Sequence, residues 1–242
     1  MQLLHGDCLE LMKEIPDGSV DLILCDPPYG TTNCSWDSVL PFDKLWSEYN
    51  RLLRPDGAAV LFAAQPFTTQ LIQSNRKAFR YCWYWLKNQA TGFTFARYQP
   101  MRKIEDICVF YRKHGTYNPQ GLQVVANSQP IKKSLPQREG IYKMDTLLHE
   151  YTPQFKNYPK NVLQFNTERG MHPTQKPVPL LEYLVRTYTN EGDTVLDNCM
   201  GSGSTGVAVK RVGGRHFIGI EQDDKYFAIA KERIEEAENG QV

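Results

Sequence analysis

The sequence has few of the features that mark secreted, membrane-spanning or metal-binding proteins. Its six cysteines are scattered, and none lies in a Cys-x-x-Cys pair. This argues against a zinc site and against a disulfide framework, so we expect no bound metal. No apolar run approaches the ~20 residues that span a bilayer. Residues 1–6 lack the basic-then-apolar pattern of a signal peptide, so none is expected. These absences predict a protein of a reducing cytoplasm.

Charge of one sign is also scarce, since the formal net charge of the 242 residues is only +1. The balance is uneven, because residues 113–171 carry eight Lys and Arg against four Asp and Glu. Such an excess suits a surface that faces phosphates, although a mild excess is more often a solvated face. The length and the 41% apolar content fit one α/β domain with a small irregular insertion.

Segments that are typical of strands and helices alternate over most of the chain. Short apolar runs predict strands at 2–5, 20–25, 58–64, 80–86, 106–111, 194–196 and 216–220. Apolar residues at helical spacing predict helices at 8–15, 42–53, 68–74, 178–188, 204–211 and 223–238. Such alternation is typical of a parallel sheet. Both patterns fail over 114–170, and an irregular stretch of that length usually has a binding role or lacks order without its ligand.

The first functional signal is Asp26-Pro27-Pro28-Tyr29, which directly follows the apolar run 20–25. A carboxylate at the C-terminal end of a strand stands where open α/β sheets bind ligands. The prolines remove two N–H donors and leave carbonyl oxygens as acceptors, while Tyr29 offers a flat aromatic face. Acceptors beside a stacking face suit a planar heterocycle with an exocyclic amine. The plainer alternative is a turn that Asp26 caps.

The second signal is a glycine-rich turn at 197–206, between a predicted strand and a predicted helix. Gly201 and Gly203 allow a ligand to approach the backbone closely. Glu221 ends the next strand, where a carboxylate accepts hydrogen bonds from ribose hydroxyls. The turn therefore predicts a nucleoside-containing cofactor, with a purely structural turn as the alternative. The glycines also fit a dinucleotide pattern, but Asp197 before them suits a cationic ammonium better than a pyrophosphate.

Together with His-Pro-Thr-Gln-Lys-Pro at 172–177, these signals resemble the β-class amino-group DNA methyltransferases, in which the catalytic motif comes first and the cofactor glycines last. The resemblance covers 1–112 and 171–236. Asn198, Cys199 and Ser204 depart from it, since the family often has Pro, Phe and Thr there.

The resemblance implies a Rossmann-like, seven-stranded, mostly parallel sheet with helices on both faces, in a circularly permuted order. It implies S-adenosylmethionine as the cofactor. It also divides the chain into a catalytic domain, 1–112 and 171–242, and a target-recognition insertion, 113–170.

It further implies roles for single residues. Asp26 and the carbonyl of Pro27 would accept the two N–H bonds of the target amine, and Tyr29 would stack on a base flipped out of the duplex. The cofactor contacts it implies are Asp7, Lys176, Asp197, Gly201, Gly203 and Glu221. Lys176 would pair with the cofactor carboxylate. The alternatives are a helix N-cap for Asp7 and a solvated helix entrance for Lys176.

The predicted function is site-specific methyl transfer to N6 of adenine in double-stranded DNA. The alternatives are N4 of cytosine, methyl transfer to RNA or to a protein glutamine amide, and a non-catalytic DNA-binding module. Expected DNA contacts are Arg97, Arg102, Lys103, Lys132, Lys133 and Arg138. The aromatics among 88–103 either contact bases or pack on the sheet edge. A bacterial or phage source is expected, and a homodimer and a cognate restriction nuclease remain open as partners.

Overall fold

The computed structural model describes residues 1–31, 38–126, 129–130, 152–168 and 175–238. It contains two compact units, Met1–Asn118 with Asn161–Val242, and Pro119–Lys160. None of the helices in these ranges is long and apolar enough to cross a bilayer.

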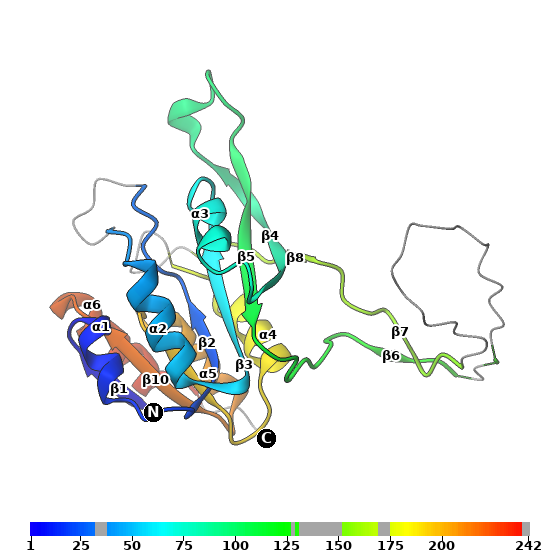
Figure 1. The fold of residues 1–242 in the computed structure, drawn as a ribbon. Helices are drawn as coiled ribbons and strands as arrows, with labels where there is room; N and C mark the ends of the chain where they lie inside the picture. Colours follow the sequence, from blue (N-terminus) through cyan, green and yellow to red (C-terminus); the bar gives the residue numbers. More distant parts are fainter. Residues whose placement is uncertain (32–37, 127–128, 131–151, 169–174, 239–242) are drawn as a thin grey trace. The chain divides into compact units, whose positions relative to one another are not determined.

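The larger unit is built on an eight-stranded sheet in the order β1-β10-β9-β2-β3-β5-β4-β8 (Figure 1). Its strands are β1 (Gln2–His5), β2 (Val20–Cys25), β3 (Leu53–Ala63), β4 (Phe79–Thr91), β5 (Arg102–Tyr111), β8 (Val162–Gln164), β9 (Thr194–Asp197) and β10 (His216–Glu221). Only the pairs that β5 makes with β3 and β4 are antiparallel. The predicted mostly parallel α/β sheet is confirmed.

The strand count differs from the expected seven, because β8 adds to the edge formed by β4. Its residues pair parallel with Tyr84–Leu86. This strand lies inside the stretch predicted to be irregular, since three residues are too few to give a periodic signal. The permuted order is visible at the other edge, where β1 pairs with β10 and His5 lies opposite Glu221.

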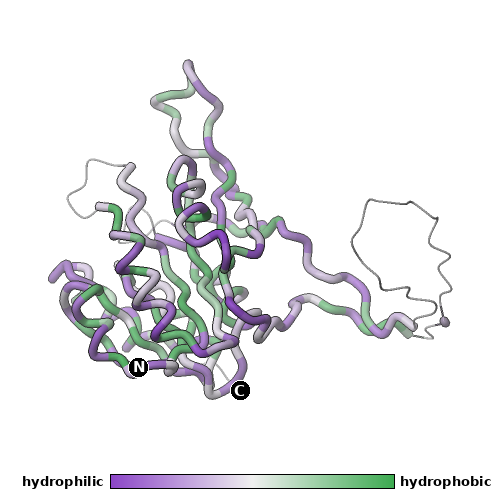
Figure 2. The backbone as a smooth tube through the Cα atoms, viewed as in Figure 1, coloured by the Kyte–Doolittle hydropathy of each residue, from purple (hydrophilic) through white to green (hydrophobic). Residues whose placement is uncertain are grey.

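Helices cover both faces of the sheet. They are α1 (Cys8–Leu11), α2 (Phe42–Leu52), α3 (Phe67–Ser74), α4 (Val178–Tyr188), α5 (Ser204–Val212) and α6 (Asp224–Glu236), with 3-10 turns η1 (Met12–Glu14) and η2 (Phe93–Phe95). Side chains of α4, α5 and α6 share a core with Leu22 and Leu24, whereas α1, α2 and α3 share another with Ile23 and Cys25. Because neighbouring residues of a strand face opposite sides and both sides are covered, β2 is apolar and buried from Leu22 to Cys25. Figure 2 shows the apolar colouring along the central strands.

The smaller unit contains a two-stranded antiparallel pair, β6 (Gln123–Val124) and β7 (Phe155–Lys156). The side chain of Asn157 donates to the carbonyl of Gly121 at 2.8 Å. The described ends of the predicted insertion, 113–118 and 161–168, belong to the larger unit. Lys132, Lys133 and Arg138 lie outside the described residues, and target recognition by the insertion stays a prediction.

Candidate active site

A cavity of about 950 Å³ opens at the C-terminal ends of the parallel strands. Asp26 follows β2, while Asp197 and Glu221 are the last residues of β9 and β10, and Asp7 follows β1 by two residues. All four line this cavity. Carboxyl ends of neighbouring parallel strands meet at one edge of a sheet, and that edge is where such folds bind ligands.

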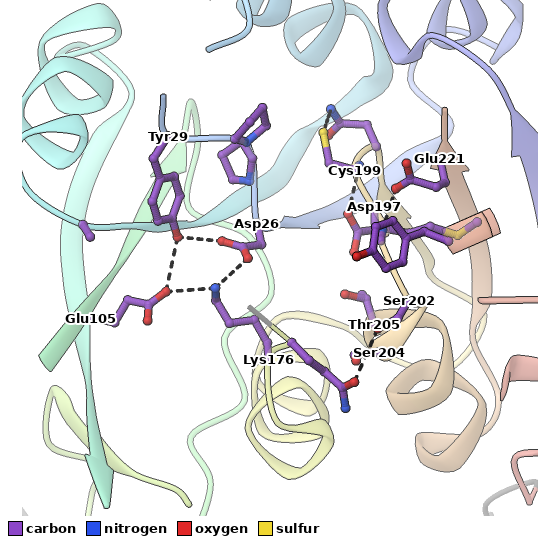
Figure 3. A pocket seen from close by; sticks show the side chains of 18 of the residues that line it. Asp26, Tyr29, Glu105, Lys176, Asp197, Cys199, Ser202, Ser204, Thr205 and Glu221 are labelled. Atoms are coloured by element: carbon purple, nitrogen blue, oxygen red, sulfur yellow. Dashed lines mark hydrogen bonds and ion pairs between the residues drawn. The ribbon is translucent and has the colours of Figure 1, made fainter. Parts of the chain in front are cut away.

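Asp26 lies in a group of paired side chains on one side of the cavity (Figure 3). Its Oδ1 accepts a hydrogen bond from the Tyr29 hydroxyl at 2.6 Å. Its Oδ2 lies 2.5 Å from Nζ of Lys176, and the same ammonium is 2.9 Å from Oε1 of Glu105. The other oxygen of Glu105, Oε2, accepts from Lys87 at 3.1 Å. Two carboxylates thus face two ammonium groups, and the group as a whole is neutral.

Burial and pairing act on these charges in opposite directions. Burial raises the pKa of Asp26 above its usual value, Lys176 draws it down, and Glu105 pushes it up. Burial alone would also raise the pKa of Glu105, but the two lysines outweigh it and the pKa is lowered. Lys176 is only 8% exposed, which by itself lowers its pKa, yet the two carboxylates bring the pKa well above the usual lysine value. Lys176 is therefore a cation at neutral pH.

The Tyr29 ring packs against the first residue of α3, Phe67. It stacks on Phe67 with ring centroids 5.0 Å apart and an interplanar angle of 23°. Pro27 and Pro28 line the cavity between Asp26 and this ring. The four residues of the predicted catalytic motif are thus brought together at one wall. Their roles in catalysis remain a prediction.

The other side of the cavity holds its carboxylates with backbone groups. Glu221 accepts from the N–H of Gly201 at 2.8 Å through one oxygen and from the N–H of Asp223 at 2.9 Å through the other. Asp197 accepts from the N–H of Cys199 at 3.2 Å, and burial raises the pKa of Asp197 to about 7. Figure 3 shows Asp197 and Glu221 across the cavity from Glu105 and Tyr29.

The two predicted glycines differ in their surroundings. Gly201 has a φ of 52° and lines the cavity, with open space where a Cβ would stand. Gly203, at φ 79°, is absent from the cavity lining, and a Cβ there would lie 2.9 Å from Cβ of Ala230 in α6. The sequence predicts close ligand approach at both positions. The structure gives Gly203 a different reason for lacking a side chain, which is its close packing on α6.

Asp7 caps a helix and also lines the cavity. Its Oδ1 accepts from the N–H groups of Leu9 at 2.7 Å and Glu10 at 3.3 Å. The N-cap alternative is therefore correct. It does not exclude a cofactor contact, since the residue stands beside the end of β10. That contact stays a prediction.

Lys176 has partners that neither sequence-based alternative named. It is buried, so a solvated helix entrance is wrong. Its ammonium pairs with Asp26 and Glu105, rather than standing on the side of the glycine turn where a cofactor carboxylate is expected. The preceding residue, Gln175, does face that turn, where its Oε1 lies 3.5 Å from the Ser202 hydroxyl.

Glu105 and Lys87 were not found from sequence. Each stands in a strand of mostly apolar residues, where a charged side chain at a buried position is unusual unless it is paired. That signal marks both positions as candidates, although it does not name their partners.

The predicted DNA contacts that the structure describes lie on the β4–β5 hairpin. Arg97, Arg102 and Lys103 are exposed, and Arg102 also lines the cavity. The aromatic alternative, packing on the sheet edge, is wrong at the tip, where Phe93 is 81% and Tyr98 87% exposed.

The sheet order and the strand-end cavity define a Rossmann-like α/β protein. Residues 20–232 match the DNA methylase family. The type II methyltransferase M2.DpnII of Streptococcus pneumoniae is 30% identical over 266 residues, covering 99% of this chain and 91% of that protein. The DNA adenine methyltransferase YhdJ of Escherichia coli K12 is 30% identical over 260 residues, covering 97% and 83%. The structure of an M1.HpyAVI–SAM complex matches with a TM-score of 0.65 at 26% identity, covering 96% of this chain and 98% of that one. The chain belongs to the N6 and N4 amino-methyltransferase family of DNA methylases.

Proposed function

We propose that the protein moves the methyl group of S-adenosylmethionine to N6 of an adenine in double-stranded DNA. The observation that carries this proposal is the meeting of two sites in one cavity. Asp26 directly follows β2, and Asp197 is the last residue of β9, the strand paired with β2; both residues line the cavity. A donor held at one strand end and an amine held at the other are then neighbours, as transfer requires.

The residues around the glycine turn fit the cofactor. Glu221 ends a strand where ribose hydroxyls are bound in such folds, and Asp197 offers a carboxylate to the ammonium of its amino-acid part. A cavity of about 950 Å³ is within the usual size of small-molecule sites and leaves room for a base. S-adenosylmethionine supplies a methyl group on a sulfonium, which is already a good electrophile.

The task of the protein is then to direct a poor nucleophile. The lone pair of an adenine amine is delocalised into the ring, and hydrogen bonds from that amine to Asp26 and the carbonyl of Pro27 turn it toward the methyl carbon. The bound cofactor would supply the methyl group, with the C–N bond formed as its C–S bond breaks, and the proton that nitrogen then loses would pass to Asp26 or to water. Positive charge grows on nitrogen in the transition state, and the Asp26 carboxylate stabilises it.

Adenine is favoured over cytosine by two observations. The motif Asp26-Pro27-Pro28-Tyr29 begins with Asp, which in this family favours adenine. The E. coli relative is named as a DNA adenine methyltransferase. The N4 amine of cytosine is the second candidate, because the same acceptors fit either exocyclic amine.

A base reaches this cavity only when it leaves the duplex. We place the DNA along the β4–β5 hairpin, because Arg102 and Ile104, at the start of β5 next to the hairpin loop, line the cavity. The loop itself is exposed, aromatic and basic. Exposed rings offer stacking faces, and Arg97 and Lys103 offer charge to phosphates. Sequence reading is assigned to the insertion, 113–170.

Modification-sensitive sequencing of DNA from a methylation-free host that expresses the chain tests the whole proposal. We expect N6-methyladenine at one short sequence. N4-methylcytosine would support the second candidate. If the host DNA stays unmodified although the purified protein binds both cofactor and DNA, the chain is a non-catalytic binding module.

A further inference from the structure

The catalytic carboxylate has no unpaired oxygen among the described residues. Oδ1 of Asp26 accepts from Tyr29 and Oδ2 from Lys176. An entering amine must therefore share or replace one of these partners. The tyrosine follows Asp26 by three residues on a loop that two prolines stiffen. Both partners also lie near Oε1 of Glu105, the Tyr29 hydroxyl at 3.3 Å and the Lys176 ammonium at 2.9 Å. The lysine is the closer of the two and stands on a flexible stem, so it is the partner that can leave Asp26 more easily.

Glu105 is placed to receive the ammonium of Lys176. Nζ of Lys176 already lies 2.9 Å from Oε1 of Glu105, against 2.5 Å from Asp26. Glu105 is itself anchored, because its second oxygen pairs with Lys87, whose ammonium lies 5.4 Å from the centre of the Trp85 ring. A small movement of one ammonium between two fixed carboxylates is enough to free an Asp26 oxygen.

We propose, on the basis of the function above, that Lys176 and Glu105 are positioning residues that prepare Asp26 for the target amine. Lys176 holds Asp26 as a carboxylate before the base arrives and moves onto Glu105 when the amine takes its place. Glu105 thus receives the lysine charge just as positive charge begins to grow on the substrate nitrogen. Without it, two cations would compete for one carboxylate.

The proposal predicts pKa shifts of opposite sign at Asp26 when Lys176 or Glu105 is replaced. The groups that act on Asp26 or face it are Cys25, Tyr29, Glu105, Lys176 and Asp197. Lys176 lowers the pKa of Asp26, and Glu105 raises it. Methyl transfer needs the carboxylate, so the rate rises with pH through that pKa. Loss of Lys176 moves this acidic limb to higher pH, and loss of Glu105 moves it to lower pH.

The test uses Lys176→Met and Glu105→Gln, with Lys13→Met as a matched control, since Lys13 is exposed and forms a surface ion pair with Glu10. The single-turnover rate is followed against pH with cofactor and DNA saturating. We expect the Lys176→Met limb to move up by about one pH unit or more, which lowers the rate at a pH on the limb by about tenfold. We expect the Glu105→Gln limb to move down, with a lower plateau because Lys176 now stays on Asp26.

Two further readouts do not need turnover. A ¹³C NMR titration of the Asp26 carboxyl in the protein without DNA should move in the same two directions, with the signal assigned through Asp26→Asn. Cofactor affinity, by calorimetry, should stay within about threefold of wild type in both variants. The NMR result stands even if no DNA is methylated, so failure of the proposed function and failure of this inference are distinguishable.

The proposal is overturned if both variants keep the wild-type limb and the wild-type titration. It is also overturned if Lys176→Met weakens cofactor binding more than tenfold with the limb unmoved, because Lys176 would then belong to the cofactor site. Should Lys176→Met fail to fold, the lower plateau in Glu105→Gln decides alone, since a glutamate that acts on Asp26 only through its charge moves the limb and leaves the plateau unchanged.

Discussion

The two sides of the cavity hold their carboxylates in different ways. Asp26 is paired with the side chains of Tyr29 and Lys176. Glu221, across the cavity, is held by the backbone N–H groups of Gly201 and Asp223. A backbone N–H is fixed by the fold, whereas a lysine ammonium moves with its flexible stem. On this difference rests our proposal that the side of the glycine turn is ready before binding, while the ions around Asp26 exchange partners.

The largest effect is expected from Asp26→Ala. The variant loses the acceptor that steers the amine and stabilises charge on it, so methyl transfer should fall by about a thousandfold or more. Cofactor affinity should remain within about threefold, because the cofactor side is held separately. A tritiated-methyl assay and calorimetry measure the two quantities. Asp56→Ala, at an exposed position of β3, is the control, and turnover retained in Asp26→Ala would remove Asp26 from the reaction.

Glu221→Ala should act on the opposite side of the cavity. Loss of a charged hydrogen-bond acceptor should weaken cofactor binding by about ten- to a hundredfold. DNA affinity, measured by fluorescence anisotropy, should stay unchanged. Glu235→Ala, an exposed position on α6, controls for charge. If cofactor affinity survives the loss of Glu221, the ribose contact is not made there.

The pH dependence of cofactor binding follows from Asp197. Burial raises its pKa to about 7, so the side chain is mostly neutral at lower pH. A cationic ammonium binds the carboxylate form, and cofactor affinity should therefore rise with pH through about 7 and fall by about tenfold per unit well below it. Calorimetry in buffers of different ionisation enthalpy would also detect the proton released on binding. Asp197→Asn should remove the pH dependence, and a flat profile in wild type would separate Asp197 from the ammonium.

The smallest effect is expected at the tip of the β4–β5 hairpin, whose residues Phe93, Arg97 and Tyr98 belong to neither side of the cavity. Phe93→Ser with Tyr98→Ser removes two exposed rings, and DNA affinity should fall by about tenfold through lost stacking. Cofactor affinity is the internal control. Arg97→Ala should reduce the dependence of DNA affinity on salt by about one phosphate contact. Unchanged DNA binding in all of these variants would place the duplex elsewhere.

The sequence predicts which strand ends line the cavity better than it predicts the ion network, for a physical reason. Strand ends and glycine turns are local, so residues 26–29, Asp197 and Glu221 could be placed at the cavity from short stretches, and their roles stay predictions. The ion network joins residues far apart in the chain, since Lys176 and Asp26 are 150 positions apart. Nothing in the local pattern states which buried charge pairs with which.

The strands of the fold divide in a similar way, into those with a clear apolar pattern and those without one. Six-residue runs such as β2 predicted their strands, and the permuted order followed from the order of the motifs. The three residues of β8 gave no pattern, and β3 begins earlier than expected, at Leu53, because exposed residues 54–56 hide its start. The long hairpin of β4 and β5 was also underestimated, because its outer residues are polar and exposed and lack the apolar alternation of a buried strand.

The most direct test of the central claim is a bisubstrate conjugate. In it, N6 of an adenine nucleoside is linked to the 5′ end of a second adenosine, where the cofactor carries its sulfur. If the ends of β2, β9 and β10 form one cavity for both partners, the conjugate should bind more tightly than the cofactor product alone. Asp26→Ala and Glu221→Ala should each weaken it in calorimetry. A conjugate affinity that responds to Glu221→Ala but is untouched by Asp26→Ala would contradict the shared cavity.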